Sequence, residues 1–326
     1  MKTAFVNLPY PIPIVRRYRC SYNAPTFLLP PIELMYLEAV ARKWNNQKTI
    51  VIDAVAEGLN GDQVLDKLKS FGPDLIATIT GVESVNTDMA EIRRLKLAMP
   101  DVRIVMMGHL VTVFPEEYLN DGIADYIIAS EPEETFSELC KKLDSGNSTE
   151  KMPGLFSFPE GRLSVGPPRL RMENIDSLPF PDRTLIDNSR YGEPFCKKPF
   201  TTMLSSRGCP FNCVYCISTY GDKMSFRSPE NILEEIKIIA GSGIRALRFL
   251  DDTFNVRTKR VAEICELIIS SGIRLEWTCL SRPDTIDPEV LPLMRRAGCI
   301  RLYMGIESGS QKMLDLYRRG YDRELA

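Results

Sequence analysis

Short β-rich runs alternate with helical patterns through the first 143 residues of the chain. Strands are predicted at residues 2–8, 49–54, 74–80, 102–107 and 124–129, with segments of helical apolar spacing between them. Five strands separated by helices, with no hairpin signal, predict an α/β domain with a doubly wound parallel sheet of the Rossmann or flavodoxin type. Because ligands bind beyond the carboxyl ends of the strands in such sheets, we expect a ligand site there.

Residues 144–200 differ in composition from the segments on either side. A polar stretch precedes a small predicted hairpin at residues 155–165, and a Pro-rich extended segment follows. We interpret this part as a structured connector. From residue 201 the alternation resumes, with strands expected at 202–205, 246–250, 274–280 and 300–306, each followed by a helix. Residues 201–326 therefore supply about four βα units.

Charge and composition argue against several classes of protein. The 41 basic and 43 acidic residues give a net charge of −2, which disfavours nucleic acid or an anionic membrane as partner. No apolar run reaches the ~18–20 residues that span a bilayer, and the N-terminus lacks a signal-peptide pattern, so we expect a cytoplasmic protein. A single His disfavours His-rich metal sites and Ser-His-Asp triads. Nine Cys without an export signal indicate thiols or thiolate ligands rather than disulfides.

Three of the Cys residues, Cys209, Cys213 and Cys216, lie within eight residues directly after a predicted strand. Three local thiolates suit a 4Fe–4S cluster with one iron left open, or a zinc site completed from elsewhere. Structural zinc sites usually use paired Cys-x2-Cys motifs or His, whereas this loop has one such pair and the only His lies about 100 residues earlier. The available ligands favour the iron–sulfur cluster.

The pattern Cys209-x3-Cys213-x2-Cys216, with aromatic Tyr215 before the last Cys, resembles that of the radical S-adenosylmethionine (SAM) enzymes. The resemblance implies that the three Cys hold a 4Fe–4S cluster whose fourth iron binds the amino and carboxylate groups of SAM. Electron transfer from an external flavodoxin- or ferredoxin-type donor would then cleave SAM to a 5′-deoxyadenosyl radical.

Loops that follow the strands of this domain are implied to contact SAM. The implied contacts are Tyr215, Asp251, Asp252, Arg282, Glu307 and Ser308. A carboxylate at Asp252 can accept hydrogen bonds from the SAM ammonium, or Asp252 or Thr253 caps the next helix. Arg282 can pair with the SAM carboxylate or with Asp284, and Glu307 can instead belong to a tight turn.

A parallel domain before the motif narrows the resemblance to the cobalamin-dependent radical SAM enzymes, in which the strand-end loops cradle the corrin. The residues implied to contact cobalamin are Leu8, Pro9, Thr80, Gly81, Gly108, His109, Ser130 and Glu131. Since the loop after the first strand has no His, we do not expect a protein ligand to cobalt. We expect His109 to contact the corrin periphery, to cap a loop or to be structural.

Two observations leave other interpretations of the N-terminal half open. Relatives have a GEGE-like pattern where this chain has Ser130-Glu131-Pro132-Glu133. Because Pro132 replaces a Gly of that pattern, the sequence does not support a close approach of the backbone to the corrin there. The N-terminal half could also be a scaffold, or it could bind another nucleotide. No GxGxxG motif or P-loop follows Leu8, which disfavours a classical dinucleotide site.

The function implied by the resemblance is methyl transfer to an unactivated carbon of a small molecule. One SAM would methylate cobalt, and the radical from a second SAM would abstract the substrate hydrogen. The alternatives are an oxidative cyclisation or rearrangement with the same cofactors, tRNA methylthiolation, and a catalytically incomplete cluster-binding module. Methylthiolation usually needs a second three-Cys set, and the N-terminal half has only Cys20 and Cys140.

The number of βα units suggests that the domain is incomplete. Relatives have six units in a partial barrel, whereas residues 201–326 supply four. The strand at 300–306 would then be an exposed apolar edge, which natural folds normally cover. We expect that the chain is a fragment, or that another segment or chain completes it.

Overall fold

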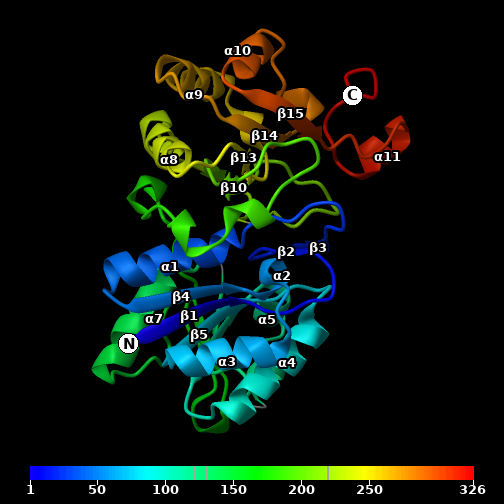
Figure 1. Cartoon of the computed structure of the whole chain (residues 1–326). Helices are drawn as coiled ribbons and strands as arrows, with labels where there is room; N and C mark the ends of the chain where they lie inside the picture. Colours follow the sequence, from blue (N-terminus) through cyan, green and yellow to red (C-terminus); the bar gives the residue numbers. More distant parts are fainter. Residues whose placement is uncertain (121, 130, 219) are drawn as a thin grey trace. The chain divides into compact units, whose positions relative to one another are not determined.

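A computed structural model of the chain describes residues 1–120, 122–129, 131–218 and 220–326. Figure 1 shows its helices and strands. The chain divides into two compact units. Unit 1 comprises Met1–Met172 and Leu178–Arg190, and unit 2 comprises Glu173–Ser177 and Tyr191–Ala326. The predicted connector, residues 144–200, is thus divided between the two units.

Unit 1 is built on a seven-stranded sheet in the order β4-β1-β5-β6-β7-β8-β9. The first five strands of that order are parallel. Strands β8 and β9 form a hairpin that joins the sheet antiparallel to β7. The strands are β1 (Lys2–Asn7), β4 (Lys48–Asp53), β5 (Leu75–Ile79), β6 (Arg103–Met107), β7 (Tyr126–Ile128), β8 (Leu155–Ser157) and β9 (Ser164–Val165).

Helices connect the parallel strands of unit 1 and cover the sheet. They are α1 (Ile32–Trp44), α2 (Ala54–Glu57), α3 (Gly61–Phe71), α4 (Val85–Ala98), α5 (His109–Val113), α6 (Pro115–Leu119) and α7 (Glu133–Ser145). Helix α3 begins at a capping box formed by Asn60 and Gln63 and ends at Gly72 in the left-handed conformation.

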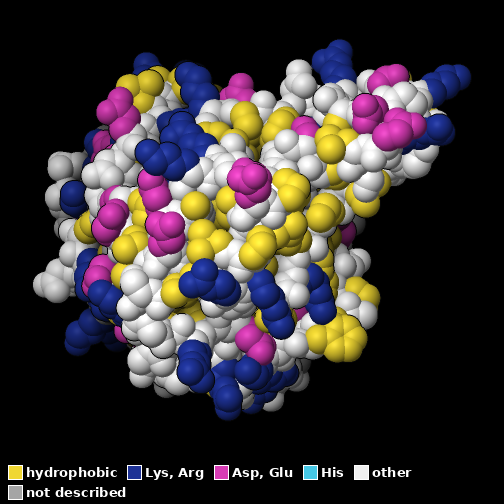
Figure 2. Space-filling view, turned by 90° about the horizontal axis from the view of Figure 1, so that it is seen from above, with side chains coloured by type: hydrophobic (Ala, Val, Ile, Leu, Met, Phe, Trp, Pro, Cys, Tyr) yellow, Lys and Arg dark blue, Asp and Glu magenta, His cyan; other side chains and the backbone are white. Residues whose placement is uncertain are grey.

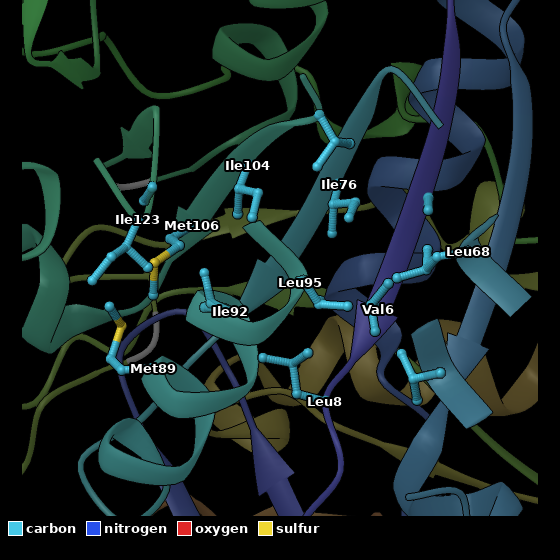
Figure 3. Packing of buried hydrophobic residues seen from close by; sticks show 14 of the residues in the cluster. Val6, Leu8, Leu68, Ile76, Met89, Ile92, Leu95, Ile104, Met106 and Ile123 are labelled. Atoms are coloured by element: carbon cyan, nitrogen blue, oxygen red, sulfur yellow. The ribbon is translucent and has the colours of Figure 1, made fainter. Parts of the chain in front are cut away.

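Both faces of the unit 1 sheet are buried because successive strand residues point to opposite faces. On one face, Val6 and Ile76 pack in a hydrophobic core with Leu68 of α3 and Leu95 of α4 (Figure 3). On the other face, the ring of Phe5 lies 5.6 Å from the ring of Phe136 of α7, measured between centroids.

Two predictions for unit 1 were wrong. The segment between β1 and α1 contains an antiparallel hairpin, β2 (Ile14–Arg16) and β3 (Ser21–Asn23), where no hairpin was expected. The loop predicted after β6 contains the short helix α5, which begins at His109. Both elements are only three to five residues long, and such lengths are too short for hydrophobic periodicity to reveal.

Unit 2 contains a parallel sheet in the order β10-β13-β14-β15. The strands are β10 (Phe200–Met203), β13 (Ala246–Phe249), β14 (Glu276–Ser281) and β15 (Cys299–Met304). A small antiparallel pair, β11 (Ser206–Arg207) and β12 (Ser225–Phe226), brackets the segment that contains the three Cys. The helices are α8 (Pro229–Gly241), α9 (Thr258–Ser270), α10 (Leu291–Arg296) and α11 (Gln311–Leu316).

The core of unit 2 lies between the sheet and its helices. Its centre is a group of three rings, Phe249, Phe254 and Trp277, whose centroids are 4.7–5.6 Å apart. Short 3₁₀ helices complete the two units at Pro159–Gly161, Ile175–Ser177, Arg183–Leu185, Asn188–Arg190, Phe254–Val256 and Pro283–Thr285.

One face of the molecule illustrates the balanced charge of the sequence. On the face seen in Figure 2, basic side chains are dispersed among acidic and hydrophobic ones. Within the part of the chain that the structure describes, no helix is long and apolar enough to span a membrane.

Candidate functional site

The loop between β11 and β12 carries the three Cys residues of the motif. Gly208 begins this loop with a φ of +86°, and a Cβ there would lie only 2.0 Å from the carbonyl oxygen of Lys223. A side chain is therefore excluded at this position. From Cys209 to Cys216 the loop contains no helix or strand. Cys209 and Cys213 are half-buried, and Cys216 is exposed.

Two arginine side chains meet at the sulfur of Cys213. Arg282 Nη1 donates to Cys213 Sγ at 3.3 Å, and Arg319 Nη1 donates to the same atom at 3.2 Å. Arg282 also donates two 2.9 Å hydrogen bonds to the carboxylate of Asp284 and lies over the ring of Phe211. The predicted pair of Arg282 with Asp284 is therefore present, and its predicted contact with the SAM carboxylate stays a prediction.

Arg319 is a site residue that the sequence analysis missed. It lies in the segment after α11, at no motif and at no strand end. Its side chain reaches the loop across 106 positions of sequence separation. Only the basic pair Arg318-Arg319 before Gly320 marks the position in the sequence, and such a pair is ordinary at the end of a helix.

The two predicted carboxylates after β13 occupy different environments. Asp251 is completely buried and accepts hydrogen bonds from the backbone N–H of Ser205 at 2.7 Å and from the hydroxyls of Ser205 and Ser206 at 2.5 and 2.6 Å. These bonds commit Asp251 to the connection between β10 and β11. Asp252 is half-buried and accepts from the Ser218 hydroxyl at 2.7 Å. Thr253 lies 3.5 Å from Cys209 Sγ through its hydroxyl and does not cap the next helix.

Tyr215 and Glu307 are exposed, and Ser308 is half-buried. The Tyr215 hydroxyl accepts a 2.9 Å hydrogen bond from Arg319. Partial burial, together with the nearby carboxylate of Glu307, raises the pKa of Tyr215 although Arg319 opposes the shift. Glu307 is exposed with a φ of +72°, and the Ser308 hydroxyl accepts from the backbone N–H of Ser310 at 3.1 Å. The last two residues therefore form the tight turn that was one predicted alternative.

The cysteine loop has the chemistry that an anionic, thiolate-ligated cluster needs. It offers three thiols, and two guanidinium groups donate hydrogen bonds to the sulfur of the middle one, Cys213. Among residues 1–120, 122–129, 131–218 and 220–326, no three His, Cys, Asp or Glu side chains lie close enough to hold a metal ion together. The loop therefore supplies the donor atoms that such a cluster needs, and in this structure its three sulfur atoms are not gathered at one point.

Unit 1 contains a cavity of about 300 Å³ at the carboxyl ends of β6 and β7. Gly108 turns the chain from β6 into α5 with a φ of +134°, and a Cβ there would lie 2.2 Å from the carbonyl oxygen of Thr80. Burial, reinforced by the charge of Arg19, lowers the pKa of His109 below its usual value. The cavity is lined by Tyr18, Arg19, Met107, Gly108, His109, Thr112, Ile128 and Ala129.

A buried polar network fixes the loops near this cavity. Asp88 of α4 accepts hydrogen bonds from Arg16 at 2.8 Å, from Ser84 at 2.6 Å and from Thr80 at 2.7 Å. Arg16 also donates to Asn7 Oδ1 at 2.7 Å and to the carbonyl oxygen of Leu8 at 3.2 Å. The ends of β1 and β5 are thus tied to the β2–β3 hairpin, whose turn supplies two residues of the cavity lining.

Of the residues predicted to contact cobalamin, Gly108 and His109 line this cavity. Leu8 instead belongs to the hydrophobic core, and the Thr80 hydroxyl is committed to Asp88. Glu131 is buried and accepts from Arg171 at 2.8 Å.

Gly81 and Pro9 do not line the cavity either. Gly81 is buried against Ser21, and Pro9 is half-buried in the loop after β1. Ser130 lies outside the described residues.

The sequence analysis missed Tyr18 and Arg19, which line the cavity. They belong to the connection that runs from residue 8 to residue 31, between β1 and α1. Connections longer than about 12–15 residues are often functional, so the length of this segment was the available signal.

The cavity fits part of a large cofactor rather than all of one. Its volume lies at the lower end of the ~300–1,000 Å³ range of small-molecule sites, and its lining mixes aromatic, aliphatic and polar groups as such sites do. One edge of a corrin, with its amide side chains, matches this size and chemistry.

Two family models match the chain. The radical SAM superfamily model covers residues 203–326, and the B12 binding domain model covers residues 23–140. The first range contains the cysteine loop with Arg282 and Arg319. The second contains the cavity-lining residues of β6, α5 and β7.

Curated proteins and solved structures resemble the chain over most of its length. It is 33% identical to the uncharacterized methyltransferase PH0819 of Pyrococcus horikoshii, over 89% of this chain and 63% of the relative. It is 24% identical to the anaerobic magnesium-protoporphyrin IX monomethyl ester cyclase of Rubrivivax gelatinosus, over 89% of this chain and 54% of the relative. The structure of the cobalamin-dependent S-adenosylmethionine radical enzyme OxsB, with aqua-cobalamin and S-adenosylmethionine bound, matches 99% of this chain and 46% of that chain, with a TM-score of 0.78 and 19% identity.

The chain spans about half to two thirds of the length of these proteins. The two family models confirm the predicted cofactors, which are a 4Fe–4S cluster, SAM and cobalamin. The chain thus combines a radical SAM domain at residues 203–326 with a B12-binding domain at residues 23–140.

Proposed function

We propose that the chain acts in a cobalamin-dependent radical SAM methyltransferase that methylates an unactivated carbon of a small molecule. The observation that carries this proposal is the three-Cys loop of unit 2, with two guanidinium groups at Cys213, in a chain that also has a B12-binding domain. The similarity to a protein described as a methyltransferase supports methyl transfer as the outcome.

In this proposal the cluster and SAM together supply a 5′-deoxyadenosyl radical, and cobalamin supplies the methyl group. Cys209, Cys213 and Cys216 hold the cluster. Asp252, the less buried of the two carboxylates after β13, accepts hydrogen bonds from the SAM ammonium. Tyr215, which is 47% exposed, presents its ring to the adenine.

The unit 1 cavity receives an edge of the corrin in this proposal. Because the pKa of His109 is lowered, the imidazole is neutral near pH 7 and can both donate and accept a hydrogen bond. An amide side chain of the corrin offers both a donor and an acceptor. Tyr18 and Arg19, from the β2–β3 hairpin, border the same cavity.

We also propose the finer architecture that the sequence predicted. Residues 1–143 form a Rossmann- or flavodoxin-like domain, residues 144–200 connect it, and residues 201–326 form the first βα units of a partial barrel. The parallel order β10-β13-β14-β15 supports this. An external flavodoxin- or ferredoxin-type protein supplies the electron, and the cytoplasm is the proposed location.

A second candidate function keeps the cofactors but not the methyl transfer. The 24% identity to an anaerobic ester cyclase favours an oxidative cyclisation or rearrangement as that candidate.

The two functions are distinguished by supplying SAM with a deuterated methyl group. The reconstituted protein is incubated with cobalamin, a reductant and small-molecule extract from its source cells, and products are analysed by mass spectrometry. A product that carries the label and is absent with a Cys213→Ala variant supports methyl transfer. Deoxyadenosine that depends on the extract, without label in any product, contradicts methyl transfer and favours the second candidate.

A further inference from the structure

The segment that follows α11, Tyr317–Tyr321, packs directly on the cysteine loop. The backbone N–H of Val214 donates to the carbonyl oxygen of Tyr317 at 3.3 Å. The rings of Tyr215 and Tyr317 meet edge to face, with centroids 5.2 Å apart. The last part of the chain and the loop are therefore one packed structure, although about 100 residues separate them in the sequence.

Arg319 is the centre of this contact and is only 5% exposed. Its Nη1 donates to both Cys213 Sγ at 3.2 Å and the Tyr215 hydroxyl at 2.9 Å. Its Nη2 donates to the carbonyl oxygen of Gly305, and its Nε donates to the Tyr321 hydroxyl at 3.1 Å. All three nitrogens of the planar guanidinium are thus held, which fixes the position of its positive charge.

Gly305 makes room for this arrangement. A Cβ at Gly305 would lie 2.7 Å from the carboxylate of Glu307 and 3.4 Å from Arg319 Nη2. The Tyr321 hydroxyl, which accepts from Arg319, lies 3.0 Å from the carbonyl oxygen of Gly305 and can donate to it. The carbonyl oxygen of Gly305, directly after β15, therefore accepts hydrogen bonds from both Arg319 and Tyr321.

The charges of the two arginines at Cys213 are not equivalent. Arg282 forms a two-bond ion pair with Asp284, which offsets part of its charge. The hydrogen bonds of Arg319 go to the thiol of Cys213, the hydroxyls of Tyr215 and Tyr321 and a backbone carbonyl, and none of these acceptors is a carboxylate. Of the two arginines at this sulfur, Arg282 therefore has a carboxylate among these hydrogen-bond partners and Arg319 does not.

We propose that Arg319 is a positioning residue for the iron–sulfur cluster, which holds the Cys213 thiolate and Tyr215 in place and raises the reduction potential of the cluster. This inference rests on the proposed function, because it requires that Cys213 is a cluster ligand. A fixed N–H···S hydrogen bond and a nearby positive charge stabilise the state that carries one more electron. Reduction adds one electron from an external reductant, and no bond at Arg319 forms or breaks.

The test is a redox titration of the anaerobically reconstituted full chain, followed by EPR of the reduced cluster. Arg319→Gln removes the charge and keeps a polar side chain of similar reach. Its midpoint potential is expected to shift to a more negative value, by 59 mV for each tenfold loss of preference for the reduced state. Arg318→Gln is the matched control, because Arg318 is the exposed neighbour in the sequence, and no shift is expected for it.

A second variant keeps the test decisive if Arg319→Gln fails to retain its cluster. Arg319→Lys retains the charge but lacks the planar fork that serves Cys213 and Tyr215 together, so a smaller shift in the same direction is expected. Cluster-containing variants that titrate at the wild-type potential would overturn the inference. A wild-type protein that assembles no cluster would instead refute the proposed function, so the two failures are distinguishable.

Discussion

Replacing Asp88 with Asn should destabilise unit 1 far more than the loss of an ordinary surface ion pair. The side chains of Arg16 and Asp88 are 2% and 0% exposed, and their charged atoms are 2.8 Å apart. At an effective dielectric constant of about 20, Coulomb's law gives an attraction of roughly 6 kcal/mol, most of which offsets the cost of desolvating both groups. Asp88→Asn leaves the buried Arg16 charge without its counter-ion, which costs about 3–5 kcal/mol.

A matched control lies on the same helix. Glu91 pairs with Arg94 at 3.0 Å, but the two side chains are 23% and 31% exposed, so Glu91→Gln should cost at most about 1 kcal/mol. The variant Arg16→Met/Asp88→Asn removes the unpaired cation as well. It should therefore be more stable than the sum of the single changes predicts, by about 1–3 kcal/mol.

The assay uses the distribution of the two Trp residues, because Trp44 lies in α1 of unit 1 and Trp277 lies in unit 2. In a Trp277→Phe background, Trp44 fluorescence reports urea unfolding of unit 1. The free energy of unfolding of each variant is taken from the midpoint and slope of its transition. If Asp88→Asn costs no more than Glu91→Gln, the argument that the buried network organises the loops beside the cavity fails.

Three further predictions concern single positions. Gly208→Ala should lower the free energy of unfolding by at least about 1–2 kcal/mol, because its φ is positive, and should lower the iron bound after reconstitution. Gly241→Ala is the control, because there is open space around its Cβ position, and it should leave both quantities unchanged or raise stability. Equal iron content in the two variants would contradict this. Asp251→Asn should cost about 1–3 kcal/mol in urea unfolding of unit 2, because the amide NH2 replaces one carboxylate oxygen and at least one of the three donors from Ser205 and Ser206 loses its acceptor. A neutral result would contradict the role of Asp251 as an anchor. The pKa of His109 should lie below 6.5 in a proton NMR titration, where the imidazole signals belong to the only His in the chain. The contribution of the neutral imidazole to folding stability is then fully present above pH 6.5 and is lost as the pH falls through the lowered pKa. A pKa at or above 6.5 would refute the argument from burial.

Local patterns in the sequence were enough to predict the main elements. The strands at residues 2–8 and 74–80 correspond to β1 and β5, and the helix expected at 32–43 corresponds to α1. These segments are long enough for their apolar spacing to report burial. The cysteine loop could be found for a related reason, because its three Cys residues are close together in the sequence.

The parts that could not be predicted depend on contacts between distant residues. Arg16 reaches Asp88 over 72 positions, and Arg319 reaches Cys213 over 106 positions, and neither pair has a local signature. Contacts between distant residues also explain why Asp251 and Asp252 have different environments. Both follow β13, but only the folded chain determines that the hydroxyls of Ser205 and Ser206 meet Asp251.

The central claim is that the three Cys of the unit 2 loop bind one 4Fe–4S cluster that in turn binds SAM. The most direct measurement is the iron content and EPR spectrum of the anaerobically reconstituted, reduced protein, with and without SAM. The account predicts about four iron atoms per chain and a spectrum that changes when SAM is added, with both lost in Cys213→Ala and both retained in the control Cys20→Ser. Undiminished iron binding by Cys213→Ala, or a cluster spectrum that SAM does not alter, would contradict it.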